Sequence, residues 1–147
     1  MSSRRGVVHL LCSLSLLAAA SACDSTQANP VEADYVLQSL NESALPYDHE
    51  GLGCCTYLSG ELELEEGRYT MSLTFRNRNS GLVFTAIEWG RYSQPQPGLL
   101  SFSRDSSAVA PLGLDVGTLA GNGIEVTFGG EGPGSPDQFH AFFVLRE

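Results

Sequence analysis

The spacing of apolar residues is the feature that most constrains the fold of this chain. In many short runs apolar and polar side chains alternate, and clusters of Gly, Pro, Asn and Ser separate the runs. A period of two is typical of strands with one buried face, and no stretch of eleven or more residues follows the helical period of 3.6. At 147 residues the chain has the length of one domain. The pattern predicts a single all-β sandwich or barrel.

The clearest pair of predicted strands spans residues 57–64 and 68–76. Apolar residues occupy alternate positions in both, and Glu65-Glu66-Gly67 joins them. Gly67 can take the positive φ that a short hairpin loop requires. We therefore expect a hairpin with Glu61 and Glu63 on its solvated face.

Six further strands bring the predicted total to eight. They cover residues 34–40, 82–92, 99–104, 114–120, 124–128 and 139–146. Asn-Gly favours tight turns, so Gly121-Asn122-Gly123 predicts a second hairpin. Gly90 predicts a bulge. Turns or loops are expected at residues 94–98, 105–111 and 129–137.

The first 22 residues have the pattern of a cleaved signal peptide. Arg4 and Arg5 precede an apolar run at residues 7–20, and small residues end the segment. The apolar run is shorter than the ~20 residues that a membrane span needs. Cys23 follows directly, and Ala20-Ser21-Ala22-Cys23 resembles the bacterial lipobox. By that resemblance Cys23 receives acyl chains. Residues 24–32 are polar and include Pro30, so residues 23–32 are expected to form a tether, and residues 33–147 the barrel domain. The alternative is ordinary cleavage that leaves a soluble secreted protein.

The charge of the chain excludes one class of partner. Its basic residues are all arginines, and the formal net charge is −9. Loss of Arg4 and Arg5 leaves six arginines against 17 acidic residues, a net charge of −11. Such a chain repels phosphate backbones, so no nucleic-acid partner is expected. We expect acyl chains on Cys23, rather than overall charge, to provide the membrane attachment.

Cys54 and Cys55 leave three alternatives open: two free thiols, a vicinal disulfide or an intermolecular bridge. The first is slightly favoured, because neighbouring strand residues point to opposite faces. A zinc site with His49 is disfavoured, since a lone Cys-Cys pair lacks the usual ligand spacing. No metal or cofactor is expected.

No motif in the sequence names a reaction, and the chain is predicted not to be an enzyme. Downstream of residue 23 the histidines are His49 and His140. Residues 48–50 (Asp-His-Glu) are interpreted as a solvated loop. His140 alternates with apolar neighbours and is expected on the outer wall.

Several segments together resemble the small bacterial lipocalin-like lipoproteins, over about residues 33–146. They are residues 35–41, 59–64 with 67–75, 117–122 with 124–126, and 143–146. The resemblance implies an eight-stranded antiparallel up-and-down barrel of the calycin type, in the bacterial cell envelope. The family's Gly-x-Trp is replaced here by Asp34-Tyr35, and Tyr35 stacked on Arg146 is the expected barrel-end plug.

Two functions follow as expectations. In the first, an envelope lipoprotein binds a small apolar ligand in its barrel; in the second, the barrel is a non-catalytic scaffold for protein interaction or inhibition. The apolar strand faces supply the residues of the pocket, or of a filled core: Leu58, Leu62, Tyr69, Met71, Phe75, Phe84, Trp89, Phe102 and Phe143.

Overall fold

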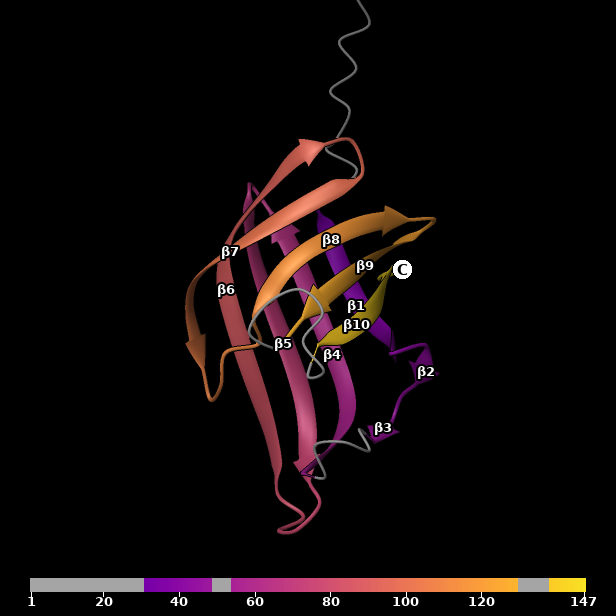
Figure 1. Cartoon of the computed structure of the whole chain (residues 1–147), viewed down its shortest axis with the longest axis vertical. Helices are drawn as coiled ribbons and strands as arrows, with labels where there is room; N and C mark the ends of the chain where they lie inside the picture. The colour runs from indigo at the N-terminus through magenta and orange to yellow at the C-terminus, as the bar shows by residue number, and fades with distance from the viewer. Residues whose placement is uncertain (1–30, 49–53, 130–137) are drawn as a thin grey trace, which may run out of the picture.

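The computed structural model describes residues 31–48, 54–129 and 138–147, and within them the protein is all-β (Figure 1). Eight strands form a barrel: β1 (Ala33–Leu40), β4 (Cys55–Glu65), β5 (Arg68–Asn77), β6 (Val83–Gln96), β7 (Leu99–Ala108), β8 (Leu114–Ala120), β9 (Gly123–Phe128) and β10 (Phe139–Leu145). Two short strands, β2 (Ser43–Ala44) and β3 (Tyr47–Asp48), lie in the connection between β1 and β4. The predicted signal peptide, Cys23 and most of the predicted tether lie outside the described residues.

The barrel is closed and antiparallel. From β4 to β10 each strand pairs with the next along the chain, and β1 pairs with both β10 and β4. The last contact that closes the ring consists of four residue pairs, from Ala33 opposite Leu64 to Val36 opposite Glu61. Closure leaves none of the eight strands with an unpaired edge along its whole length. The predicted closed barrel and its strand number are confirmed.

The middle of the barrel is filled by side chains. Five residues of the predicted pocket or core are buried there: Leu62, Tyr69, Met71, Phe102 and Phe143. Removing such side chains from water supplies the main favourable free energy of folding. The interior at this level is a packed core.

The two ends of the barrel differ in how the strands are connected. At the end that we call the turn end, two residues join each hairpin: Glu66-Gly67, Pro97-Gly98 and Gly121-Asn122. Glu66 and Gly67 have φ values of 47° and 75°, the combination that a type I′ hairpin turn requires. At the opposite end, the loop end, the connections are longer.

Among the predicted boundaries that were wrong, three change a predicted turn or loop. β6 continues to Gln96, so the predicted turn at 94–98 is reduced to Pro97-Gly98; Pro95 is accommodated at an irregularity between Ser93 and Gln96. β7 continues to Ala108, and half of the loop predicted at 105–111 is strand. β9 begins at Gly123, because Gly121 at φ 61° makes Gly-Asn, not Asn-Gly, the turn pair.

A bulge shifts one predicted face, and a second register slip lies near Gly90. The register of β4 slips between Tyr57 and Ser59, so that Tyr57 faces the interior and Leu58 is half-buried outside the core. A second slip lies beside Gly90, where a bulge was predicted, but its extra residue is Asp105 on β7, between the pairs Trp89–Ser106 and Gly90–Arg104. A Cβ atom on Gly90 would overlap the carbonyl oxygen of Ser103. The close approach of β7 therefore requires glycine here.

Candidate functional site

A cavity of about 330 Å³ opens at the loop end of the barrel. Four aromatic side chains line it: Tyr57 from β4, Phe75 from β5, Phe128 from β9 and Phe139 from β10. Their positions follow from strand register, since Tyr57 pairs with Phe75 and Phe128 pairs with Phe139. An apolar, concave site of this kind is typical of small-molecule binding, and its volume lies at the lower end of the usual ~300–1,000 Å³.

The four rings form a continuous aromatic wall. Phe128 and Phe139 are stacked with centroids 5.2 Å apart, and Tyr57 meets Phe139 edge-on, also at 5.2 Å. The Tyr57 and Phe75 centroids are 6.2 Å apart. These separations are typical of favourable aromatic pairs, so the wall is held in shape without a ligand.

The facing wall comes from the loop between β7 and β8, through Ala110, Pro111 and Leu112. The loop leaves β7 at Val109, whose φ of 70° is an outlier for a β-branched residue. Strain of that kind persists only where surrounding contacts fix the backbone. The Ala110 N–H donates to the Ala108 carbonyl oxygen across Val109 at 2.9 Å, and Glu88 holds the other end of the loop.

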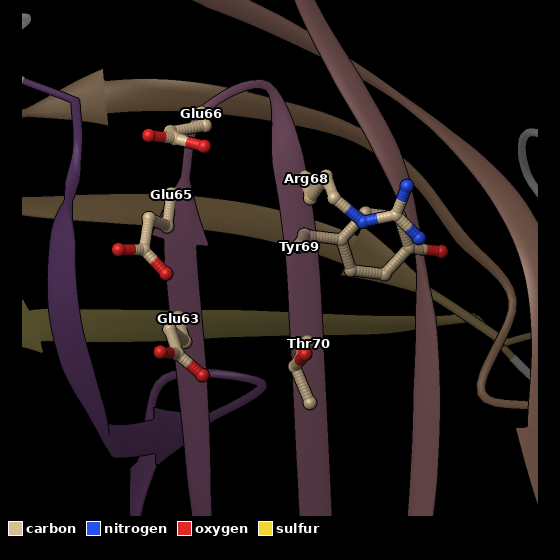
Figure 2. A pocket seen from close by; sticks show the side chains of 6 residues that line it. All are labelled: Glu63, Glu65, Glu66, Arg68, Tyr69 and Thr70. Carbon is tan, nitrogen blue, oxygen red and sulfur yellow. The ribbon is translucent and has the colours of Figure 1, made fainter.

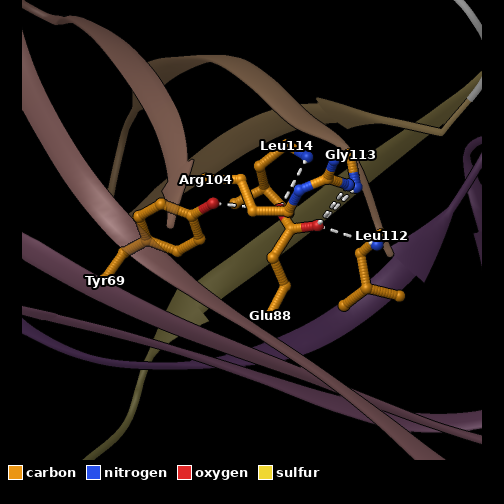
Figure 3. A network of polar contacts seen from close by, with 6 residues as sticks. All are labelled: Tyr69, Glu88, Arg104, Leu112, Gly113 and Leu114. Atoms are coloured by element: carbon orange, nitrogen blue, oxygen red, sulfur yellow. Dashed lines mark hydrogen bonds and ion pairs between the residues drawn. The ribbon is translucent and has the colours of Figure 1, made fainter. Parts of the chain in front are cut away.

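Glu88 on β6 is fully buried and accepts four hydrogen bonds (Figure 3). Its Oε2 accepts from the backbone N–H groups of Leu112 and Gly113, both at 2.8 Å. Its Oε1 accepts from the Leu114 N–H at 3.1 Å and from the Tyr69 hydroxyl at 2.9 Å. The carboxylate thus holds the start of β8 and the loop that forms the facing wall.

The charge of Glu88 is balanced as well as hydrogen-bonded. Arg104 on β7 places Nη1 3.7 Å from Oε2. Burial, and secondarily the hydrogen bond to Glu88, raises the pKa of the Tyr69 hydroxyl well above its ordinary range, so Tyr69 remains a donor. A buried carboxylate is tolerated only with partners of this number and strength. Both oxygens are occupied, which makes Glu88 a positioning residue.

Two other hollows lie on the outside of the barrel. One, at the turn end, lies beside the glutamates Glu63, Glu65 and Glu66, whose carboxylates extend to the side away from Arg68 (Figure 2). The other, of about 390 Å³, crosses β8, β9 and β10 and includes His140 and Glu125 on the outer wall. No group of three or more His, Cys, Asp or Glu within the described part of the chain could hold a metal ion.

The structure separates the residues that the sequence analysis grouped as pocket or core. Phe75 lines the cavity, whereas Leu62, Tyr69, Met71, Phe102 and Phe143 fill the middle of the barrel. Phe84 lies on the same face of β6 as Ala86 and Glu88 but is 38% exposed at the loop end, outside the core. Trp89 lies on the opposite face and is half-buried outside the core. Assigning Leu58 and Trp89 to the interior was therefore wrong, and Phe84 lies at the open end of the inward face.

Several other predictions have clear outcomes. Glu61, Glu63 and His140 are exposed, as expected. Cys54 and Cys55 are joined in a vicinal disulfide, so the slightly favoured assignment of two free thiols was wrong; Cys55 lies at the cavity. Of the loop predicted at 48–50, Asp48 is exposed in β3, and the other two residues lie outside the described ranges.

The predicted plug residues have other partners. Tyr35 is buried, and its hydroxyl donates to the Val31 carbonyl oxygen at 3.1 Å. Arg146 pairs with the carboxylates of Glu61 and Asp34 on the outer face. Both lie at the turn end, and Val31 with Tyr35 closes it.

Comparison of the chain with protein-family models, with curated proteins and with solved structures finds no match. Among the described residues, no helix has the length and apolar character to cross a membrane.

Proposed function

We propose that the chain is a lipid-anchored protein of the bacterial cell envelope whose lipocalin-like barrel binds a small apolar ligand without catalysis. The observation that carries the ligand-binding proposal is the aromatic cavity at the loop end, formed by Tyr57, Phe75, Phe128 and Phe139. Barrels of eight strands have room for one small ligand.

The chemistry of the cavity favours binding over reaction. Three of the four rings carry no polar group, and burial raises the pKa of the Tyr57 hydroxyl, which keeps it protonated. The buried carboxylate nearby has both oxygens occupied. Burial of a ligand against the rings gains roughly 25 cal/mol per Å² of apolar surface. A ligand that is flat or branched, and uncharged at its buried part, fits these walls.

A displacement experiment tests the ligand site. The purified chain is titrated with the apolar fluorophore N-phenyl-1-naphthylamine, and lipid extracts of the same cells are then used as competitors. Ala86 is buried and lines the cavity, so Ala86→Leu reduces its volume and should weaken probe binding by about tenfold or more. Ala44→Leu, at an exposed position of β2, is the matched control. Equal probe binding by both variants would refute the site.

The anchor is tested separately. Cells that express the chain, or its Cys23→Ala variant, are labelled with a palmitate precursor. Label in the unaltered chain alone supports acylation at Cys23; equal label in both excludes it.

The second candidate is a non-catalytic interaction or inhibitor module. A projecting hairpin between β5 and β6 with exposed apolar side chains favours it. A chain of this class would bind no apolar probe in the cavity and would lose its activity when the hairpin is altered.

A further inference from the structure

The connection between β5 and β6 presents apolar side chains to solvent at the loop end. We define the tip as residues 76–84. Its exposed apolar side chains are Leu82 at 59%, Val83 at 54% and Phe84 at 38%. In Figure 1 the tip is the lowest part of the ribbon and projects beyond the neighbouring strands.

The tip is an ordered turn. Asn77 Oδ1 accepts hydrogen bonds from the N–H groups of Asn79 and Ser80, both at 3.0 Å. The Asn77 N–H donates to the Leu82 carbonyl oxygen at 2.8 Å. The Arg78 N–H donates to the Cys54 carbonyl oxygen at 2.8 Å and fastens the tip to the base of β4. The apolar side chains are therefore held outward by a defined backbone.

Both faces of the tip carry an exposed apolar side chain. Val83 and Phe84 are consecutive in β6, so their side chains point to opposite sides of the hairpin, and both are exposed. A partner that covers both must surround the tip. A fluid bilayer surrounds a projecting wedge without a preformed slot, whereas a protein would need a deep groove.

The charge of the tip is opposite to that of the chain. No acidic residue occurs between positions 69 and 87, and the segment contains Arg76 and Arg78. Arg78 pairs with Asp48 at 2.9 Å, whereas Arg76 is exposed and has no ion pair within the described residues. Basic and apolar side chains together are the combination that binds anionic lipid surfaces.

The tip is continuous with the cavity. The Phe84 ring lies 5.9 Å from the ring of Phe75, which lines the cavity wall. Exposed Val109, on the loop that forms the facing wall, lies at the same end of the barrel. A membrane or protein surface that buries the tip therefore lies next to the mouth of the cavity.

We propose that the tip inserts into the surface of an anionic lipid bilayer, which places the cavity mouth against the membrane. Leu82, Val83 and Phe84 enter the interface and Arg76 meets the lipid phosphates. The route of the ligand, from bilayer to cavity, rests on the proposed function. The membrane contact rests only on the geometry and charge of the tip.

Vesicle binding tests this contact. The full chain with Cys23→Ala, purified after export, is mixed with vesicles of phosphatidylcholine alone or of equal parts phosphatidylcholine and phosphatidylglycerol, and bound protein is measured by flotation. We expect binding to the anionic vesicles that weakens as salt is added. Leu82→Ser and Val83→Ser should each reduce the partition coefficient by about tenfold. Val116→Ser, exposed on the outer wall, should not change it.

The contribution of positive charge to vesicle binding is tested with a separate pair of variants, one in the tip and one outside it. Arg76→Gln should reduce partition into anionic vesicles by about fivefold, and Arg91→Gln, exposed on β6 toward the turn end, should have little effect. Circular dichroism and thermal melting check that each variant is folded.

The depth to which the tip inserts into the bilayer is measured by the quenching of tryptophan fluorescence by brominated lipids. In a Trp89→Phe background, the fluorescence of Phe84→Trp should be quenched on binding and that of Val116→Trp should not.

Absence of vesicle binding, or equal loss of binding in the tip and control variants, overturns the proposal. Tip variants that lose a protein partner but keep vesicle binding assign the tip to that protein and also overturn it. Leu82 and Val83 do not line the cavity, so probe affinity without vesicles reports on the proposed function alone.

Discussion

The turn end and the loop end of the barrel share the same strands but differ in their connections. Two residues join each hairpin at the turn end, whereas the connections at the loop end span residues 41–54, 78–82, 109–113 and 129–138. Short turns fix register and leave little surface to vary, and longer connections can build walls and projections. This chain specifies its fold at one end of the barrel and places its candidate site at the other.

The ends also differ in how they are stabilised. Val31 and Tyr35 close the turn end with apolar packing and one hydrogen bond to the backbone. The loop end depends on Glu88, whose carboxylate holds the backbone of a loop 24 to 26 residues away. If this contrast is correct, substitutions at the two ends should differ in size and kind.

The largest effect is expected at Glu88. Glu88→Ala leaves three backbone N–H groups and Arg104 without their acceptor, and should lower the free energy of unfolding by about 3–5 kcal/mol. Urea unfolding measures the change. Glu63→Gln, exposed at the turn end, is the control and should change it by less than ~0.5 kcal/mol. Similar values for both would mean that the network does not hold the loop.

A smaller effect is expected at Tyr69, which follows the Glu66-Gly67 turn in β5 and whose hydroxyl donates to Glu88. Tyr69→Phe removes a hydrogen bond to a carboxylate and should lower the free energy of unfolding by roughly 1.5–3 kcal/mol.

The same residue gives a pH dependence. Burial raises the pKa of the Tyr69 hydroxyl above its ordinary value of ~10, so the folded state favours the protonated form. The stabilisation is complete below that ordinary value and is lost as pH rises toward the raised pKa. Urea midpoints should therefore fall above pH ~10, less steeply in Tyr69→Phe. Burial also raises the pKa of Tyr35, Tyr57 and Tyr92, so some dependence should remain. An unchanged slope in the variant would contradict the assignment.

At the turn end, Gly67→Ala should lower the free energy of unfolding by about 1 kcal/mol, because φ at this position is 75°. Thermal melting provides the measurement. Gly67→Asn should recover part of the loss, since Asn tolerates the left-handed region. A loss in Gly67→Asn as large as in Gly67→Ala would show that the φ value is not the cause.

The smallest effect on stability is expected at the tip. Leu82→Ser and Val83→Ser remove exposed side chains and should change the free energy of unfolding by less than ~0.5 kcal/mol, although vesicle binding falls. A large loss in urea unfolding would show that the tip supports the barrel rather than a partner.

The sequence predicts the barrel because apolar and polar residues alternate regularly in the strands that form its hairpins. Alternation in residues 57–64 and 68–76, with Gly67 between them, is local information and leads to the observed hairpin. Which residues of β6 face the interior could not be predicted from local alternation in the same way. An inward Glu88 beside a half-buried Trp89 contradicts the apolar pattern, and the partners that make it favourable come from Leu112–Leu114, far along the chain.

The candidate site was predicted only in part for the same reason. Phe75 is among the residues that the sequence assigns to the pocket or core, and Phe139 begins a predicted strand. Tyr57 enters the interior through a bulge at Leu58 that no glycine or proline marks in the sequence. The facing wall depends on the Glu88 network, which is a tertiary interaction. Local pattern therefore locates the strands, and long-range contacts decide what the open end can bind.

The pairing of β1 with both β10 and β4 has a consequence for the order of assembly. β1 cannot complete its pairing until β10 is present, because Tyr35 is opposite Leu145. A chain that lacks β10 can form at most an open sheet, in which β1 and β9 each have one edge without its barrel neighbour. Ring closure therefore requires the first and the last barrel strands together.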